Sequence, residues 1–348
     1  MSEPRLRVAV TGAAGFLGSH VAAHYRDTGA EVVALDIVAP DLDEVTWVPC
    51  DVTADGPGWE AFAGADVVVH TAAIVAEAGD PARFVAVNVE GSRRAALAAA
   101  RRGVGRFVHI SSITVYGARC APGSMTAEDA PLVPSGGLYT DTKIAAEHAV
   151  LHVAAEHGLA ATIVRPGDIY GVRSQPWIER PLALAARGLL PLVDGGRWWL
   201  SPTYVDDVVD GIVRAAAAPH AAGRVYNLAA PPVPVRAFFG YHARHLGVTL
   251  PSMPRAVVRA LGVGAEVGGR WLGRTPPFSA SSMEYVTHAG GYASDRAREE
   301  LGWEPRVPLE EGMARTLAAY PFVPLPRWRT RGRRAGLSQL RGPSRRGR

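Results

Sequence analysis

The sequence has little cysteine and no long apolar run. Its two cysteines, Cys50 and Cys120, are too few for a disulfide framework or a cysteine-based metal site, and we expect no bound metal. No stretch of 18 consecutive apolar residues occurs, so we predict no transmembrane helix. The apolar segment at residues 6–10 runs directly into a glycine-rich turn without a charged-then-apolar leader. We therefore expect a cytoplasmic protein.

Lysine is almost absent: of 37 basic residues, only Lys143 is a lysine. Nine of the arginines, and no acid, fall in residues 324–348. The formal net charge of the chain is +4, so removing these nine leaves −5 for residues 1–323. The basic balance therefore does not indicate nucleic-acid binding by the body. The Pro, Gly, Ser and Arg content of residues 321–348 predicts a disordered tail, which either is a solvated appendage or contacts anionic surfaces.

The first half of the sequence alternates short apolar strands with helices. With 348 residues and 48% hydrophobic residues, the chain can bury a large core. Strands buried on both faces and separated by helices are typical of an α/β Rossmann-type fold with a doubly wound parallel sheet. We predict a dinucleotide-binding domain at 1–165 and a smaller substrate-binding lobe, mainly at 166–320, with some later segments returning to the first domain. The predicted strands are Leu6–Thr11, Glu31–Asp36, Val45–Cys50, Asp66–His70, Arg106–Ser111 and Thr162–Arg165, and the main helices are Phe16–Asp27, Pro81–Arg102, Leu138–Glu156, Ser174–Arg187 and Val205–Ala217.

A glycine triplet follows the first predicted strand. Gly12, Gly15 and Gly18 permit a tight turn, close approach of the backbone to a pyrophosphate, and close packing of helix on strand. The following helix N-terminus presents free N–H groups to the phosphates. Asp36 ends the second strand, where a carboxylate accepts ribose hydroxyls and repels a 2′-phosphate. The pattern predicts NAD as the cofactor, with NADP as the alternative.

Other strand ends contribute to this predicted cofactor site. A carboxylate at Asp51, after the third strand, is placed to bond the adenine amino group, and small residues after His70 leave room for the cofactor to pass. The remaining predicted cofactor contacts are Ala14, Phe16, Leu17, Val52, Thr71, Ala72, Ala73, Ser111, Pro166 and Ile169, together with Tyr139 and Lys143.

Tyr139 and Lys143 are spaced i, i+4 at the start of a predicted helix, so both side chains share one face. A phenol is a poor base because its reference pKa is about 10, and a nearby ammonium is expected to lower that pKa. The pair can then exchange a proton with a carbinol or carbonyl oxygen during hydride transfer. Ser112, at the end of the fifth strand, is the predicted donor to the substrate oxygen, with Ser111 and Thr114 as helpers.

These motifs together resemble the extended short-chain dehydrogenase/reductase superfamily, the NAD-dependent epimerase/dehydratase family. The motifs are TGAAGFLG, Asp36, SSITVYG, YTDTK and RPGDIYG (165–171), and the resemblance spans about residues 5–320. It implies a Rossmann-fold oxidoreductase with Ser112, Tyr139 and Lys143 as the catalytic triad, and a lysine that also bonds the nicotinamide ribose. It further implies a homodimer formed through the helix that carries Tyr139 and the segment Pro81–Arg102.

The C-terminal half favours one branch of this superfamily. Arg197 is followed by Trp198 and Trp199, which suggests an apolar pocket wall; we expect Thr114, Tyr170, Trp198 and Trp199 to contact substrate. Ser112 is followed by Ile-Thr rather than the Asp-Glu of dehydratases. The segment at 290–313 resembles that of 3β-hydroxysteroid dehydrogenase-like enzymes. We predict a dehydrogenase/reductase that interconverts a secondary alcohol and a ketone on an apolar substrate: steroid-like, polyketide-like or β-keto acyl. The alternatives are a nucleotide-sugar 4-epimerase with tightly bound NAD and a non-catalytic dinucleotide-binding protein.

Overall fold

The computed structural model describes residues 5–76, 78–117, 123–272 and 287–321. The arginine-rich tail beyond residue 321 and Cys120 lie outside the described residues. Cys50 is a free, buried cysteine. In the part of the chain that the structure describes, none of the helices combines the length and hydropathy needed to cross a membrane.

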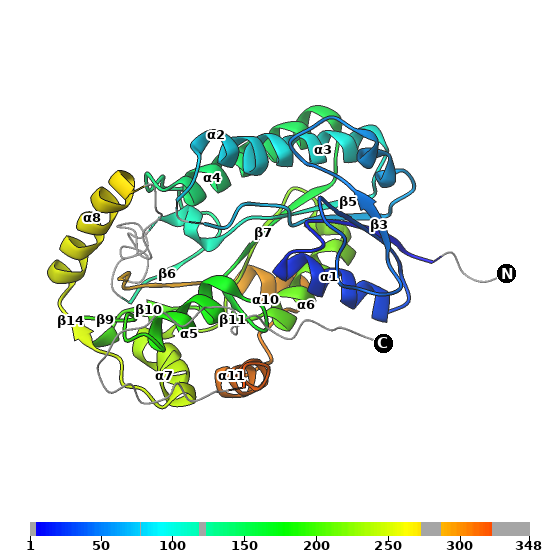
Figure 1. The fold of residues 1–348 in the computed structure, drawn as a ribbon. Coiled ribbons are helices and arrows are strands. Elements are labelled where there is room, and N and C mark those ends of the chain that lie inside the picture. The colour runs from blue at the N-terminus through cyan, green and yellow to red at the C-terminus, as the bar shows by residue number, and fades with distance from the viewer. Residues whose placement is uncertain (1–4, 77, 118–122, 273–286, 322–348) are drawn as a thin grey trace, which may run out of the picture.

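The centre of the molecule is a seven-stranded parallel sheet (Figure 1). Its strand order is β12-β7-β5-β4-β1-β2-β3, which confirms the predicted Rossmann-type fold. Six strands match the predicted ones to within two residues at each end. The seventh, β12, comes from the second half of the chain; its four residues include the polar Asn227, so its sequence lacks a continuous apolar run. The strands are β1 Arg7–Thr11, β2 Glu31–Asp36, β3 Thr46–Pro49, β4 Val67–His70, β5 Arg106–Ile110, β7 Ala161–Pro166 and β12 Val225–Leu228.

Helices cover both faces of the sheet (Figure 1). Alternate residues of each strand point to opposite faces, so Val8 and Val10 pack against one helical layer and Ala9 against the other. The first layer comprises α1 Phe16–Asp27, α6 Val205–Ala217 and α10 Asp295–Leu301. The second comprises η1 Pro57–Phe62, α3 Gly91–Arg101 and α4 Leu138–His157.

The predicted helix over residues 81–102 is three segments rather than one. These are α2 Pro81–Phe84, the π-helical η2 Val85–Glu90, and α3. The π-helical turn contains the buried Asn88, whose amide bonds the backbone of Ile74 and the hydroxyl of Thr142 on α4. A widened turn of this kind re-aims a side chain, and here it ties α4 to the strand end after β4.

The remaining elements form the smaller lobe and its connections. Its core is aromatic and aliphatic, with Tyr170, Ile178, Phe238 and Met313 buried together. Helix α8 runs along the outside of this half of the molecule (Figure 1). The strands are β6 Met125–Thr126, β8 Asp168–Tyr170, β9 Leu192–Val193, β10 Trp199–Leu200, β11 Pro202–Tyr204, β13 Val233–Pro234, β14 Ser252–Met253 and β15 Gly291–Tyr292. The helices are η3 Ile113–Tyr116, η4 Gln175–Glu179, α5 Arg180–Ala185, η5 Asp194–Gly196, η6 Pro219–Ala221, α7 Val235–Leu246, α8 Arg255–Leu272 and α11 Leu309–Ala318.

The strand order reverses between β1 and β4. From β1 the chain builds outward to β2 and β3, then crosses to β4 and continues to β5, β7 and β12. In an open parallel sheet this reversal opens a crevice at the carboxyl ends of the strands, where ligands bind. The glycine-rich turn after β1 and the catalytic candidates after β5 meet at this end.

Candidate active site

The glycine-rich turn is built so that larger residues do not fit. Gly12 has φ +71°, and a Cβ placed on it would lie 2.7 Å from the backbone nitrogen of Ala72. A Cβ on Gly18 would lie 2.1 Å from the carbonyl oxygen of Gly12. Gly15 caps the twelve-residue α1 with no side chain of its own. The N–H groups of the first turn are therefore left for a bound anion, as a dinucleotide pyrophosphate requires.

Asp36 and Arg173 hold this turn from two sides. The Asp36 carboxylate accepts a hydrogen bond of 3.0 Å from the backbone N–H of Ala14. Arg173, from the segment after β8, donates a bond of 3.1 Å to the carbonyl oxygen of Ala14. Its backbone has φ +73°, a left-handed conformation that is costly for a residue with a side chain. Arg173 was not among the predicted site residues, although it lies only two residues beyond the RPGDIYG motif.

Asp51, the predicted adenine contact, bonds a neighbouring residue and does not line the cavity. The Asp51 carboxylate accepts bonds from the backbone N–H and the hydroxyl of Thr53, and these bonds lower its pKa. Val52 is buried, with its side chain close beneath Gly91 at the start of α3. Both residues thus support the turn after β3, and neither lines the cavity described below.

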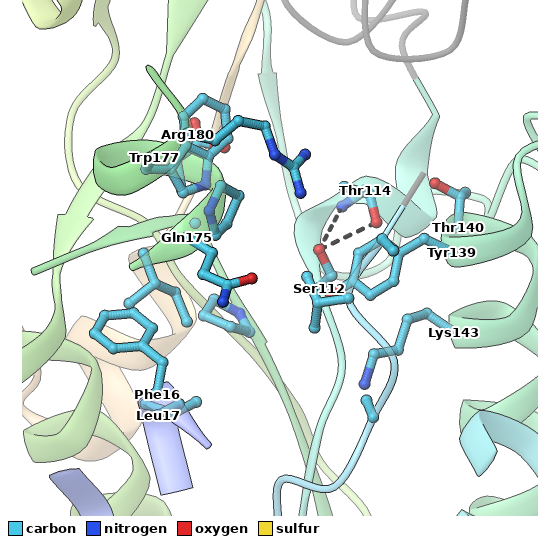
Figure 2. A pocket seen from close by; sticks show the side chains of 18 of the residues that line it. Phe16, Leu17, Ser112, Thr114, Tyr139, Thr140, Lys143, Gln175, Trp177 and Arg180 are labelled. Atoms are coloured by element: carbon cyan, nitrogen blue, oxygen red, sulfur yellow. Dashed lines mark hydrogen bonds between the residues drawn. The ribbon is translucent and has the colours of Figure 1, made fainter. Parts of the chain in front are cut away.

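Ser112, Tyr139 and Lys143 converge where β5 ends and α4 begins (Figure 2). The Ser112 oxygen accepts hydrogen bonds from the backbone N–H of Thr114 at 3.2 Å and from its hydroxyl at 3.1 Å. Ser112 also forms a hydrogen bond with Tyr139, and its proton can be donated there or to a substrate oxygen. Lys143 is buried, its ammonium donates to the carbonyl oxygen of Ile110 at 2.8 Å, and it lies 6.0 Å from the centre of the Tyr139 ring.

Burial dominates the ionisation of this pair. Desolvation raises the pKa of Tyr139 to about 12, and a hydrogen bond with Ser112 opposes the rise. The net pKa of Tyr139 therefore lies above its reference value, and not below it as expected from the sequence, because the loss of water outweighs the other influences. Desolvation also lowers the pKa of Lys143 to about 8, while the negative charge of Glu147 opposes this change.

Glu147 lies one turn beyond Lys143 on α4 and is held by Arg165 of β7. The guanidinium donates two bonds to the carboxylate, at 2.8 and 2.6 Å, and both side chains are buried. Arg165 also donates to the hydroxyl of Tyr116 at 2.7 Å, and that hydroxyl donates to Asn227 of β12. Because the carboxylate is occupied by Arg165, the ammonium of Lys143 stays directed at the strand end.

A cavity of about 710 Å³ joins the glycine-rich turn to the catalytic candidates. The walls beyond the catalytic residues include Gln175, Trp177, Arg180, Leu184 and Phe239, which the sequence analysis did not select. They come from the irregular η4–α5 segment and α7, whose spacing alone gives no signal for a pocket. The predicted site residues that line the cavity are Gly12, Ala14, Gly15, Phe16, Leu17, Gly18, Thr71, Ala73, Ser111, Ser112, Thr114, Tyr139, Lys143, Pro166 and Ile169.

Besides Asp36, Asp51 and Val52, four predicted contacts are not among these lining residues. Ala72 backs the glycine turn through its main chain. Tyr170 is buried in the lobe core, against Tyr204 and Phe238. Trp198 packs beneath the guanidinium of Arg197, and Trp199 lies in β10, paired with Pro234 and 37% exposed. The tryptophan that lines the cavity is therefore Trp177, and not Trp198 or Trp199.

Comparisons with known proteins show which family this chain resembles. Residues 8–229 match the NAD dependent epimerase/dehydratase family. A dTDP-glucose 4,6-dehydratase of Streptomyces griseus is 33% identical, over 89% of this chain and 93% of that protein. A 3-beta-hydroxysteroid dehydrogenase of Mycolicibacterium neoaurum is 29% identical, over 92% of this chain and 94% of that protein. The solved structure of MoeE5 with UDP-glucose and NAD has a TM-score of 0.72 and 25% identity, covering 90% of this chain and 97% of that one.

The chain belongs to the NAD-dependent epimerase/dehydratase family, as its motifs predict. It is an NAD(P)-dependent enzyme of the extended short-chain dehydrogenase/reductase type, rather than a non-catalytic binding protein. The cradle at Gly12 and Gly18, which any Cβ would fill, and the free N–H groups of α1 fit the pyrophosphate of NAD.

Proposed function

We propose that this protein is an NAD-dependent reductase that interconverts a ketone and a secondary alcohol on a largely apolar substrate. One observation carries the proposal. A single cavity connects the glycine-rich turn to Ser112, Tyr139 and Lys143, and then continues between apolar side chains such as Trp177, Leu184 and Phe239. A substrate held there places its carbonyl against the catalytic residues and its apolar body against these walls.

Three side chains divide the work at the carbonyl. When bound, NAD in its reduced form supplies the hydride for the carbonyl carbon. Ser112 donates its hydroxyl proton as a hydrogen bond to the carbonyl oxygen, because its own oxygen already accepts from Thr114. Tyr139 transfers its phenolic proton to the same oxygen, which becomes the alcohol. The ammonium of Lys143 stabilises the phenolate that remains, and oxidation of the alcohol reverses each step.

Dehydration fits these residues poorly. Ser112 is followed by Ile113, which is 1% exposed and packed with Val115 and Ile144. No acidic side chain follows the catalytic hydroxyl to remove or deliver a second proton. The similarity to a 3-beta-hydroxysteroid dehydrogenase supports an apolar alcohol or ketone as substrate.

A nucleotide-sugar 4-epimerase that retains NAD is the second candidate. The likeness to a structure that contains UDP-glucose and NAD favours it. The two activities separate in one screen, in which the protein is incubated with NADH and apolar ketones, or with NAD and nucleotide sugars. We expect net consumption of NADH with a ketone. Epimer formation without net change in NADH contradicts the reductase proposal.

We also propose that the enzyme is a homodimer, formed through α4 and residues 81–102. Sedimentation velocity over a range of concentrations tests this, with a dimer as the expected species. A monomer at all concentrations contradicts it.

A further inference from the structure

Arg180 faces the catalytic residues from the opposite wall of the cavity. It is the first residue of α5, and its side chain lines the cavity together with Ser112 and Thr114. Figure 2 shows its guanidinium directed away from its own helix and towards the side where Thr114 lies. A substrate bound in the cavity would therefore lie between Arg180 and the catalytic residues, with the group that contacts Arg180 at the end remote from the reacting carbonyl.

Arg180 differs from the other cations of the cavity. Lys143 donates to the carbonyl oxygen of Ile110, and Arg173 donates to that of Ala14. Within the described residues, Arg180 has neither an ion pair nor a hydrogen-bond acceptor for its side chain. The neighbouring Glu179 accepts from the hydroxyl of Tyr320 instead. The five N–H donors of the Arg180 guanidinium are therefore free for a ligand.

The residues around Arg180 favour a substrate that is largely apolar and carries one negatively charged group. Trp177, Leu184, Leu190 and Phe239 also line the cavity and carry no charge, while the adjacent Glu179 is another lining residue. Arg180 is exposed to solvent, and its planar guanidinium matches a carboxylate with two parallel hydrogen bonds.

We propose that Arg180 binds a carboxylate of the substrate, so that the enzyme acts on an oxo acid. This molecule carries its ketone at Ser112 and Tyr139, its carboxylate at Arg180, and an alkyl chain along Trp177 and Leu184. The proposal rests on the reductase function proposed above and narrows its substrate class from apolar ketones in general to anionic ones.

A matched pair of substrates tests this inference: a β-keto acid of medium chain length and its methyl ester. The wild-type enzyme is expected to have the higher kcat/KM for the acid. In Arg180→Ala the ratio of kcat/KM for acid over ester falls about tenfold to a hundredfold, mainly through KM, because a charge-assisted hydrogen bond is lost. Arg180→Lys keeps the charge and is expected to lie between the two.

Arg187→Ala is the matched control, since Arg187 follows the same helix, is exposed, and does not line the cavity. It is expected to leave the acid-to-ester ratio unchanged. Equal falls in both alanine variants, or none in Arg180→Ala, overturn the proposal. Competitive inhibition by UDP that is lost in Arg180→Ala, with the acid-to-ester ratio unchanged, also overturns it and assigns Arg180 to a nucleoside diphosphate.

Failure of the underlying reductase function has a different signature. In that case neither the acid nor the ester consumes NADH in the wild-type enzyme. The Arg180 subsite can then still be tested by measuring, with calorimetry, the binding of the β-keto acid to the protein in the presence of NAD. Binding that is about tenfold to a hundredfold weaker in Arg180→Ala supports the subsite, and equal binding overturns it.

Discussion

The ammonium of Lys143 donates a hydrogen bond of 2.8 Å to the carbonyl oxygen of Ile110, the last residue of β5. This bond fixes the only lysine of the chain at the end of the strand that leads to Ser112, one helical turn beyond Tyr139. A compact ammonium with three donors can hold this carbonyl and still face a phenol and a ribose. A planar guanidinium, with its fixed fork of donors, imitates this poorly.

Tyr139→Phe is predicted to reduce turnover by about 10²- to 10⁴-fold, because it removes the proton donor at the carbonyl oxygen and little else. Binding of NAD, measured by calorimetry, is expected to stay within a few-fold of wild type. Turnover that remains at the wild-type level would remove Tyr139 from the mechanism.

Ser112→Ala is predicted to lower kcat by about 10²- to 10³-fold, the usual effect of losing one donor to a developing oxyanion. Steady-state kinetics of ketone reduction measure it. Thr114→Ser is the matched control, because it keeps the hydroxyl that bonds the Ser112 oxygen. A Ser112→Ala enzyme that loses affinity but not kcat would show that the serine acts only in binding.

The rate of ketone reduction is predicted to fall as the pH rises through about 8. The pKa of Lys143 is lowered to about 8 by burial, so its charge is present below that pH and is lost above it. The neutral Tyr139 remains able to donate its proton there, because its pKa is raised to about 12. In Lys143→Arg, residual activity is expected to show no such fall, since a guanidinium keeps its charge. The same fall in both enzymes would assign it to another group.

The buried pair of Glu147 and Arg165 is predicted to contribute strongly to stability. Their side chains are 1% and 4% exposed, so Arg165→Met leaves an unpaired buried carboxylate and should lower the free energy of unfolding by about 3–5 kcal/mol. Urea denaturation measures the change. Arg298→Met breaks exposed pairs with Asp295 and Glu304 and serves as control, with no measurable shift expected. Equal shifts in the two variants would contradict the role given to the buried pair.

Asp36→Asn is predicted to shift cofactor preference from NAD towards NADP. The amide still accepts from the N–H of Ala14 but no longer repels a 2′-phosphate. Dissociation constants for NAD and NADP, measured with both proteins, give the preference. An unchanged ratio of the two constants would place the 2′-position away from Asp36.

Local signals in the sequence are enough to predict the glycine-rich turn and the placing of Tyr139 and Lys143 on one helix face. Gly12 and Gly18 are required by close backbone contacts, and Tyr139 and Lys143 share a helix face through their spacing. The six predicted strands are rich in Val, Ile and other apolar residues, although β5 and β7 also contain His109 and Arg165, and β12 was not predicted. That strand has only four residues and contains Asn227, which bonds the backbone of Thr126 and Ala293, so tertiary partners rather than apolar periodicity explain its place.

The substrate half depends on packing that the sequence does not display. Trp198 and Trp177 look equally suited to a pocket wall, yet the first packs beneath Arg197 and the second faces the cavity. Which one faces the cavity depends on how α5 and α7 pack across η4. The direction of the pKa shift of Tyr139 could not be predicted either. The sequence shows that an ammonium is nearby, but it does not show how deeply the phenol is buried.

Transfer of deuterium from NADH labelled at its transferable position tests the central claim most directly. The wild-type enzyme is incubated with this NADH and a medium-chain β-keto acid, and the product is examined by mass spectrometry. We predict one deuterium on the carbinol carbon of the product, with one NADH consumed for each alcohol formed, and no labelled product from Tyr139→Phe under the same conditions. Unlabelled ketone that is recovered in full, together with epimerised nucleotide sugar in a parallel incubation without loss of NADH, would contradict the account.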